Sequence, residues 1–245
     1  MRDVIITGGN SGLGLEIVKL HIALGDYVYS LDIEHTNSFN ELIPKNLTLI
    51  NVDLSEINSL PNLVELLQKT DVLYLNAAAA TKESFPQKSE NQILKEIQLN
   101  VISNVILIKH FLQKDKLNAK IVIISSSVRY FLSPELEIYA ASKSFISTFI
   151  ENLYDLTTLY NLSLYLFEPS GMQTNFQRNA GVKSVGNKLL DPKKVAKKIV
   201  STVIAKRGFI VKRLGLVSHF TYFLRKFVPN KIYFKFINYL FKKYR

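Results

Sequence analysis

Short apolar runs alternate with longer amphipathic stretches along most of this 245-residue chain. Several runs are almost wholly apolar and β-branched, such as Ile121-Val122-Ile123-Ile124. Strands of that composition are typical of parallel sheets, because helices cover both faces of such a sheet. The alternation therefore predicts an α/β fold in a single domain, with a doubly wound parallel sheet of about seven strands.

The expected elements follow from the change of hydrophobic period along the chain. The expected strands are Asp3–Thr7, Tyr27–Asp32, Leu47–Val52, Val72–Asn76, Ala119–Ser125 and Ser163–Glu168, with a seventh at Gly208–Lys212. The expected helices are Leu13–Leu24, Leu60–Gln68, Glu90–Gln113, Tyr139–Tyr160 and Pro192–Ala205. Ligands of such sheets bind beyond the carboxyl ends of the strands, so functional residues are sought directly after each strand.

A glycine-rich turn, Thr7-Gly8-Gly9-Asn10-Ser11-Gly12-Leu13-Gly14, joins the first expected strand to the first helix. Glycines allow a tight turn and close approach of a pyrophosphate to the backbone, and the helix N-terminus offers free N–H groups. A plain βα turn is the alternative. Because strand, turn, helix and a later acid occur in the right order, the turn predicts a Rossmann-like dinucleotide site.

Two aspartates follow the next two strands. Asp32 comes 18 residues after Gly14, where a carboxylate accepts hydrogen bonds from the adenosine ribose hydroxyls and repels a 2′-phosphate. Because no Arg or Lys stands beside it, the sequence predicts NAD as cofactor, with NADP disfavoured. Asp53 is expected to bond the adenine amino group; for both aspartates the alternative is capping of a local turn.

A tyrosine and a lysine share one face at the start of the fourth expected helix. Tyr139 and Lys143 are four residues apart. A nearby ammonium stabilises a phenolate and lowers the tyrosine pKa, so the pair suits proton transfer to a carbonyl oxygen. Ser125, Ser126 and Ser127 end the fifth strand, where a hydroxyl can hold a substrate oxygen.

Taken in order, these features resemble the short-chain dehydrogenase/reductase family in its single-domain form, over residues 1 to 205. The interval of 13 residues between Ser126 and Tyr139 matches the family spacing and selects Ser126 among the three serines. The other matching positions are Thr7–Gly14, Asn76-Ala77-Ala78-Ala79, Asn100 and Lys143.

The resemblance implies a role for each matching residue. Tyr139 exchanges a proton with the substrate oxygen, Ser126 orients the carbonyl, and Lys143 binds the nicotinamide ribose and lowers the Tyr139 pKa. Asn100 holds a water in a proton relay; a buried helical polar residue is the alternative. The implied cofactor-binding residues are Thr7, Gly8, Asn10, Ser11, Gly12, Leu13, Gly14, Asp32, Asp53, Leu54, Asn76, Ala77, Ala78, Tyr139, Lys143, Pro169, Gly171, Met172 and Thr174.

Three departures from the family pattern concern the cofactor and substrate sites. Ala79 and Ser170 stand where glycines are usual, and each adds a side chain near the cofactor. Arg129-Tyr130-Phe131 follows the serines, which places a cation and two rings near the expected pocket mouth. The residues expected to shape an apolar pocket are Phe85, Phe131, Met172 and Phe176, under a mobile segment at Gln173–Lys188.

Charge divides the chain unevenly. Residues 1–191 carry 16 Lys or Arg and all 20 Asp and Glu, whereas residues 192–245 carry 15 Lys or Arg and no acid. The sequence predicts a catalytic domain at 1–206 and a basic aromatic helical tail at 207–245 that is no independent domain. From Asn230 one helix is expected, with an apolar face of Tyr233, Phe236, Ile237, Leu240, Phe241 and Tyr244 opposite Lys231, Lys235, Asn238, Lys242 and Arg245.

Three interpretations of this tail are possible: membrane binding, packing against protein, and nucleic-acid binding. A cationic amphipathic helix binds an anionic membrane surface; alternatively its apolar face packs on the body or another subunit. Nucleic acid is disfavoured, since nothing else resembles a stacking groove. The sequence shows no signal peptide and no apolar run of the length of a membrane span, so the expected location is cytoplasmic or, through the tail, peripheral at the inner membrane surface.

The remaining expectations concern metals, assembly and rival functions. The chain has no Cys, and its four His lack ligand spacing, so no metal is expected. The resemblance implies a homodimer or homotetramer through helices at 90–113 and 139–160. The main prediction is an NAD(H)-dependent oxidoreductase acting on a secondary alcohol or ketone. The rivals are an NAD(H)-binding sensor or membrane-docked scaffold, and a nucleotide-sugar modifying enzyme.

Overall fold

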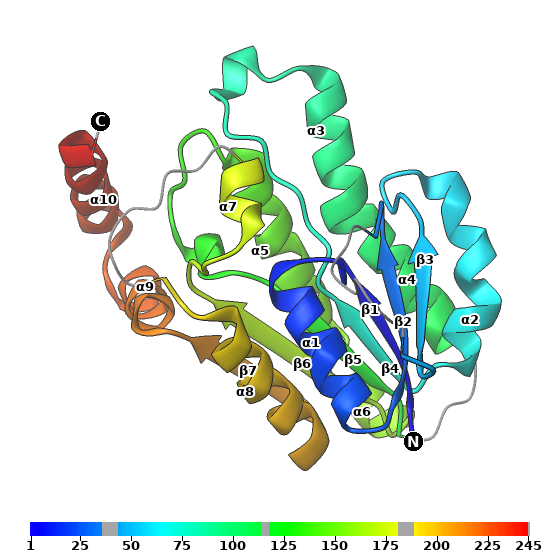
Figure 1. The fold of residues 1–245 in the computed structure, drawn as a ribbon. Coiled ribbons are helices and arrows are strands. Elements are labelled where there is room, and N and C mark those ends of the chain that lie inside the picture. The colour runs from blue at the N-terminus through cyan, green and yellow to red at the C-terminus, as the bar shows by residue number, and fades with distance from the viewer. Residues whose placement is uncertain (36–43, 114–117, 181–188, 245) are drawn as a thin grey trace.

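The computed structural model describes residues 1–35, 44–113, 118–180 and 189–244. Its centre is one seven-stranded, all-parallel sheet with strand order β3-β2-β1-β4-β5-β6-β7. Helices pack on both faces, as Figure 1 shows. The predicted doubly wound parallel sheet is confirmed. Strand order reverses between β1 and β4, which is where such sheets open a ligand crevice.

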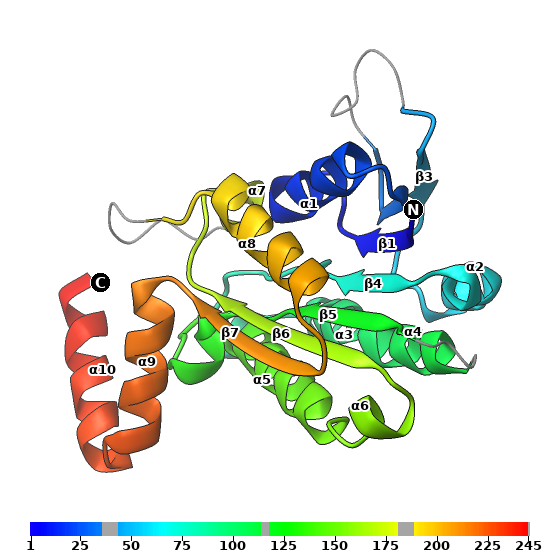
Figure 2. The same cartoon turned by 90° about the horizontal axis from the view of Figure 1, so that it is seen from below.

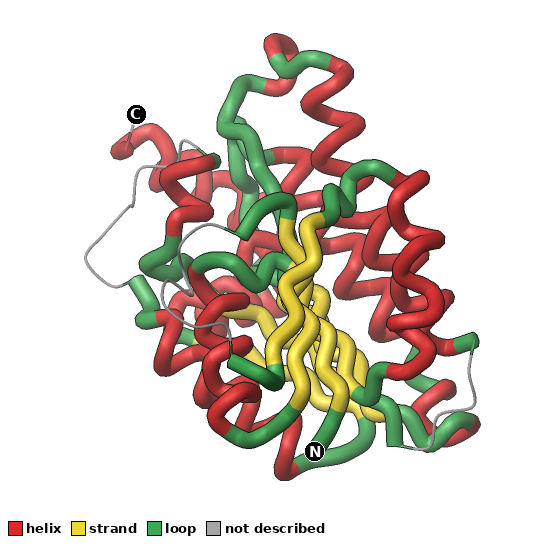
Figure 3. Tube along the Cα trace, turned by 45° about the vertical axis from the view of Figure 1, so that its right-hand side comes forward, coloured by secondary structure: helices red, strands yellow, loops and turns green. Residues whose placement is uncertain are grey.

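The strands agree with the predicted ones to within two residues at each end. They are β1 (Asp3–Thr7), β2 (Tyr27–Asp32), β3 (Leu47–Asn51), β4 (Val72–Leu75), β5 (Lys120–Ile124), β6 (Ser163–Pro169) and β7 (Phe209–Leu214). All four residues of β4 and all seven of β6 are buried, as expected for strands covered on both faces. In Figure 3 the strands form one twisted yellow layer between the helices.

The helices begin at identifiable caps. Ser89 starts α3 with a capping box to Gln92, and Asp191 accepts a hydrogen bond from the Lys193 N–H at the start of α8. The helices are α1 (Gly12–Ala23), α2 (Val64–Lys69), α3 (Glu90–Ile97), α4 (Ser103–Leu112), α5 (Glu137–Asn152), α6 (Leu156–Leu159), α7 (Asn175–Asn179), α8 (Pro192–Ala205), α9 (Leu216–Phe227) and α10 (Asn230–Tyr244). Short 3₁₀ turns are η1 (Ile57–Leu63), η2 (Phe85–Gln87) and η4 (Ser127–Tyr130), and η3 (Gln98–Ile102) is a π-turn.

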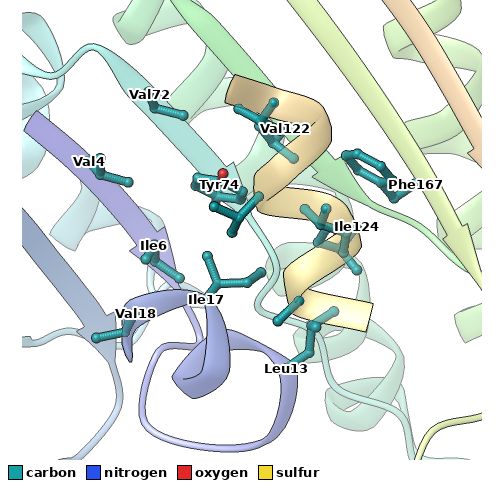
Figure 4. Close-up of a cluster of buried hydrophobic side chains, with 14 of the residues drawn as sticks. Val4, Ile6, Leu13, Ile17, Val18, Val72, Tyr74, Val122, Ile124 and Phe167 are labelled. Atoms are coloured by element: carbon teal, nitrogen blue, oxygen red, sulfur yellow. The ribbon is translucent and has the colours of Figure 1, made fainter. Parts of the chain in front are cut away.

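Two apolar cores hold the helices to the sheet. On one face Ile17 and Val18 of α1 and Ile199 of α8 pack against strand residues such as Val4 and Tyr74 (Figure 4). On the other face α2, α4 and α5 cover the sheet, with side chains that include Leu67, Leu107 and Ile146. Figure 2 shows the two helix layers above and below the strands. This packing fixes the strand ends, and therefore the loops that follow them.

Three predicted helices prove to be composite. The stretch predicted over Leu60–Gln68 spans the end of the 3₁₀ turn η1 and most of α2. The stretch predicted as one helix over Glu90–Gln113 contains the π-turn η3 between α3 and α4. The stretch predicted over Tyr139–Tyr160 begins two residues earlier and divides into α5 and α6. A π-turn places an extra residue in the helical ladder without changing the hydrophobic period nearby, so periodicity does not reveal it.

The boundary predicted at residue 206 is displaced by the sheet. β7 follows that boundary, yet it pairs in parallel with β6 from Leu164↔Phe209 to Pro169↔Leu214. The body therefore extends through Leu214, and the appended part is a hairpin of α9 and α10 beyond the β7 edge (Figure 2). The predicted helical tail had a defined helix only from Asn230, so the bounds of α9 come from the structure.

The expected apolar face of the last helix is only partly correct. Tyr233 and Ile237 are buried against the body, at 2% and 1% exposure, so this stripe packs as the alternative proposed. Phe236, predicted on the same face, is exposed. The side chains of Asn238, Leu240, Phe241, Lys242, Tyr244 and Arg245 fall outside the described residues.

Candidate functional site

A cavity of about 740 Å³ opens at the carboxyl ends of the central strands. Its volume is in the range of small-molecule and cofactor sites. The predicted residues that line it are Gly8, Ser11, Gly12, Leu13, Asp32, Leu54, Asn76, Ala77, Ala78, Ser126, Tyr139, Lys143, Pro169, Gly171, Met172 and Thr174. The predicted residues Thr7, Asn10, Gly14, Asp53 and Asn100 do not appear in its wall.

The glycine turn is packed too tightly for side chains. A Cβ on Gly14 would lie 1.9 Å from the Gly8 carbonyl oxygen, and one on Gly12 would lie 3.1 Å from Thr174. Gly12 also has φ of +53°, in the left-handed region that favours glycine. The turn thus leaves backbone at the cavity wall, at the N-terminus of α1, which is the arrangement that a pyrophosphate requires.

Thr7 and Asn76 hold this turn against the next strand. The buried Thr7 hydroxyl donates to the Tyr74 carbonyl and accepts from the backbone N–H groups of Asn76 and Ala77. Asn76 Nδ2 donates to the carbonyls of Thr7 and Gly8, at 3.0 and 3.1 Å. Thr7 therefore positions the site from behind, whereas Asn76 both positions it and lines the cavity.

Asp32 lies at the end of β2 with its carboxylate at the cavity wall. Its Oδ2 accepts the Asn10 N–H at 2.9 Å, and its Oδ1 accepts the Ile33 N–H at 2.9 Å. Asn10 thus contributes through its backbone. In the described part of the chain, Lys143 is the only Lys or Arg that lines the cavity.

Asp53 takes the role of a local cap. Its Oδ1 accepts both the N–H and the hydroxyl of Ser55, at 2.8 and 2.7 Å. The neighbouring Val52 and Leu54 line the cavity instead. The contacts favour the capping alternative over an adenine contact for Asp53.

Ser126, Tyr139 and Lys143 meet on one side of the cavity. Ser126 caps η4, where its Oγ accepts the Val128 N–H, and its side chain lines the same cavity as Tyr139. The buried Lys143 donates from Nζ to the Ile124 carbonyl at 2.9 Å, and this nitrogen lies 5.6 Å from the Tyr139 ring centre. The predicted trio is therefore assembled, from the end of β5 and the first turns of α5.

The choice of Ser126 among three serines agrees with the contacts. Ser125 is buried, and its hydroxyl is engaged with the Ser147 hydroxyl and the Lys143 carbonyl. Ser127 is buried as well. Of the three, Ser126 is the one whose side chain affects the pKa of Tyr139, in the lowering direction against the larger effect of burial.

Burial sets the proton affinities of the pair. It raises the pKa of the Tyr139 phenol, and the hydrogen bond from Ser126 acts in the opposite direction. Burial lowers the pKa of the Lys143 ammonium to about 8. The expected lowering of the Tyr139 pKa by Lys143 is not among the causes of this shift: desolvation sets its direction, and the phenol stays protonated at neutral pH.

Asn100 holds the segment after β4 from behind the cavity. It is fully buried in the π-turn η3, where Oδ1 accepts the Ala79 N–H and Nδ2 donates to the Ala79 carbonyl. Its own carbonyl accepts Asn104 Nδ2. These contacts favour the alternative of a buried polar residue, which here fixes Ala79 at the cavity wall.

The absence of a side chain at Gly215 leaves space for the Ser170 side chain. Ser170 donates its N–H to the Leu214 carbonyl, and its Oγ lies 2.4 Å from where a Cβ on Gly215 would stand. Gly215 also has φ of +98°. Position 170 thus carries a serine where the family usually has glycine, and the glycine at position 215 leaves space for the serine hydroxyl. The cavity wall at Pro169–Thr174 is preserved.

Arg129 and Tyr130 do not reach the pocket mouth as predicted. Both turn to the fully buried Glu168: Arg129 pairs with it at 3.0 Å, and the Tyr130 hydroxyl donates to both of its oxygens. Arg213 adds a second cation, at 3.3 Å. A buried carboxylate requires such partners, so Glu168 draws these side chains away from the cavity.

The substrate end of the cavity is largely apolar. Phe131, Met172 and Phe176 line it as predicted, and the Phe176 ring lies 5.1 Å from that of Tyr139. Phe85 is half-exposed and is absent from the wall. Of the segment predicted to cover the substrate, residues 181–188 fall outside the described ones. The wall also contains residues that were not predicted there and whose only signal in the sequence is apolar character: Val52, Leu99, Leu132, Leu136 and Ala180.

Comparison with known proteins gives the same family. The family model "short chain dehydrogenase" matches residues 2–184. A "Probable short-chain type dehydrogenase/reductase VdlC" of Helicobacter pylori is 25% identical, with 94% of each chain covered. An "NADPH-dependent 3-dehydrocapnine reductase" of Ornithobacterium rhinotracheale is 25% identical, over 78% of this chain and 72% of that protein.

Solved structures share the fold. A short-chain dehydrogenase from Sphingobium yanoikuyae in complex with NADPH superposes with a TM-score of 0.78 at 17% identity, over 90% and 91% of the two chains. A 4-hydroxyisoleucine dehydrogenase complexed with NADH has a TM-score of 0.74 at 20% identity, over 88% and 98%. With the family model spanning most of the body, the chain belongs to the short-chain dehydrogenase family of nicotinamide-dependent oxidoreductases.

Proposed function

We propose that the protein is an NAD(H)-dependent oxidoreductase that interconverts a secondary alcohol and a ketone. One observation carries this proposal: Ser126, Tyr139 and Lys143 line the same cavity as the glycine turn and Asp32. A bound nicotinamide would supply or accept the hydride. The residues of the chain then need only hold the carbonyl, move one proton and keep water out.

Each member of the trio has a distinct role in ketone reduction. The Tyr139 phenol is protonated at neutral pH and donates its proton to the carbonyl oxygen. Ser126 donates a hydrogen bond to the same oxygen and so orients the carbonyl. The Lys143 ammonium binds the ribose hydroxyls and stabilises the phenolate that remains after transfer.

The apolar end of the cavity supports a substrate with an apolar body. Phe131, Met172 and Phe176 surround the place where the carbonyl would meet Tyr139. Ketone or alcohol turnover is tested by a panel of ketones of increasing apolar length, with NADH oxidation as the readout. Steady NADH oxidation with one class supports the proposal, and no oxidation across the panel contradicts it.

Asp32 supports a preference for NADH. Relatives and structural neighbours bind NADPH, NADP and NADH, so the preference depends on this chain's own residues. The carboxylate lies in the cavity wall at the end of β2, where an adenosine ribose would bind, and it would repel a 2′-phosphate. Titrations of the purified chain with NADH and NADPH test this; tighter NADPH binding would contradict it.

We expect Asp32→Asn to narrow or reverse that preference. Loss of the charge removes the repulsion of a 2′-phosphate and weakens the ribose hydrogen bonds, by about ten-fold in NADH affinity. Nicotinamide fluorescence gives both dissociation constants. Glu34→Gln, which removes a charge from an exposed residue two positions on, is the control and should leave both unchanged.

Lys143 predicts a pH dependence of NADH binding. Since the pKa of its ammonium is about 8 in the cofactor-free site, the charged form is present below that pH and is lost above it. We expect the dissociation constant for NADH to rise about ten-fold between pH 7 and pH 9. Lys143→Met should bind NADH weakly at both pH values and flatten the profile; an unchanged profile would contradict the role.

The sensor or scaffold alternative differs from the proposed enzyme in one measurable result, the transfer of hydride from bound NADH. It predicts NADH binding without hydride exchange, and the assembled trio disfavours it. The Thr-Gly-x-x-x-Gly-x-Gly spacing of residues 7–14 disfavours the nucleotide-sugar alternative. Assembly as a homodimer or homotetramer stays a prediction, checked by sedimentation velocity.

A further inference from the structure

Helix α9 has its polar side turned inward. The small polar residues Ser218 and Thr221 are buried, and the Ser218 hydroxyl donates to the Glu168 carbonyl at 2.7 Å. The large apolar residues point to solvent. This outer stripe is 49–85% exposed and consists of Leu216, Val217, Phe220, Phe223 and Phe227. At 100° per residue the stripe covers about 120° of the helix, as wide as the face that usually packs on a core.

Contacts with the body hold α9 in this orientation. The Arg213 guanidinium stacks on the Tyr222 ring at 3.4 Å, and the Tyr222 ring meets Tyr130 edge to face at 5.3 Å. Arg213 and Tyr130 are both bound to the buried Glu168. Rotating α9 to bury the stripe would break the contacts among Arg213, Tyr130, Tyr222 and Glu168. These contacts therefore keep the stripe exposed.

Helix α10 adds a second exposed stripe. Its buried side is anchored by Tyr233, whose hydroxyl donates to the Tyr130 carbonyl, and by Ile237. Ile232, Phe236 and Tyr239 remain on the outside, between 38% and 67% exposed. Figure 2 shows the two helices side by side at the edge of the molecule beyond β7.

Four cations in the described part of the hairpin form no ion pair. Arg225 and Lys226 of α9 and Lys231 and Lys235 of α10 are exposed, and among the described residues none of the four forms an ion pair. The chain has no Asp or Glu after Asp191. A surface that combines exposed phenylalanines with unpaired cations is complementary to a layer that is apolar inside and negatively charged outside.

From this complementarity we infer that the α9–α10 hairpin docks the protein on a membrane surface containing anionic phospholipid. The α9 stripe enters the boundary between headgroups and acyl chains, and the neighbouring cations meet the lipid phosphates. No helix in the described part of the chain is long and apolar enough to cross a membrane. The helices therefore lie in the interface. A second copy fits less well, because two hairpins would bring like charges together.

The inward side of the hairpin, opposite the docked stripe, meets the body next to a residue that lines the cavity. Both hairpin helices contact Tyr130, and the next residue, Phe131, lines the cavity. The glycine turn is held instead by β1 and β4. Docking through the hairpin thus leaves the cofactor-binding turn untouched, and NADH binding can serve as the folding control.

The test is co-sedimentation of the full chain with vesicles of phosphatidylcholine alone and with phosphatidylglycerol added. We expect binding to the anionic vesicles, release by 0.5 M NaCl, and little binding to the neutral ones. The double variant Phe220→Glu/Phe223→Glu should lose at least ten-fold in binding. Leu159→Glu, at an even more exposed apolar residue of α6, is the control and should bind as the unchanged chain does.

A second variant separates charge from apolar insertion. Lys231→Gln/Lys235→Gln should weaken binding to anionic vesicles by about ten-fold or more and leave NADH binding intact. If the glutamate variant fails to bind NADH, Phe220→Ser/Phe223→Ser replaces it. No binding of the full chain to anionic vesicles, or equal binding by the double phenylalanine variant, overturns the inference. The inference is also overturned if the full chain stays in solution in the presence of anionic vesicles and the double phenylalanine variant differs from it in oligomeric state. The stripe would then be an interface between copies of the chain.

Discussion

Replacing Tyr139 by Phe is expected to lower kcat by at least 10³-fold while NADH still binds. The substitution removes one hydroxyl, the group proposed to donate the proton to the carbonyl oxygen from the cavity wall. Loss of a positioned acid typically costs 10²–10⁴ in rate. The ring remains and keeps its contact with Phe176, so the cavity should hold its shape. NADH oxidation with the best ketone of the panel gives kcat.

The control removes a tyrosine hydroxyl from the surface. Tyr160→Phe changes the same group on a half-exposed residue after α6, far along the chain from the trio, and should leave kcat unchanged. A wild-type kcat in Tyr139→Phe would reject the proposed mechanism. Loss of NADH binding in that variant would instead assign the hydroxyl to cofactor binding.

Gly14→Ala is expected to weaken NADH binding by at least 100-fold. The new Cβ would lie 1.9 Å from the Gly8 oxygen and 2.7 Å from Asn76 Nδ2. Since these atoms belong to the backbone of the turn and to the side chain that holds it, the turn must move. A displaced turn no longer presents its N–H groups to the pyrophosphate. Nicotinamide fluorescence titration measures the loss.

A matched glycine separates this clash from the general effect of alanine. Gly25 has φ of +77°, and a Cβ there meets nothing within 4 Å. Gly25→Ala should therefore cost some stability through backbone strain, about 1 kcal/mol, and leave NADH affinity unchanged. Equal affinities in Gly14→Ala and the unchanged chain would mean that the turn is not part of the cofactor site.

Local sequence features were sufficient to predict the strands of the sheet and the main residues of the candidate site. The apolar runs predicted all seven strands, because a strand buried on both faces must be apolar throughout. The glycine turn and the spacings from Ser126 to Tyr139 and Lys143 predicted residues that the fold brings to one cavity. A turn is a local property, and the α5 spacing is set by helix geometry, so both can be seen in a single sequence.

Tertiary contacts decided which polar residues face the ligand. Thr7 and Asn100 were predicted at the site, but their polar atoms are satisfied by backbone groups of the segment after β4. Arg129 was expected at the pocket mouth and is paired with Glu168 instead. A polar side chain takes the partner that burial leaves unpaired, and that partner lies far away in sequence.

In the α9–α10 hairpin, too, the sequence determined the composition and the tertiary structure determined which side chains are exposed. Sequence alone determined that the end of the chain is basic, aromatic and free of acids, since that is composition. It did not determine which side faces outward: the pattern favoured Tyr233 and Ile237, which are buried, whereas the phenylalanines of α9 are exposed. Only the tertiary structure decides this, because the face that a helix buries depends on the surface it meets. Here that surface presents the Glu168 carbonyl and the Arg213 guanidinium, which bind Ser218 and Tyr222 and leave the phenylalanines to solvent.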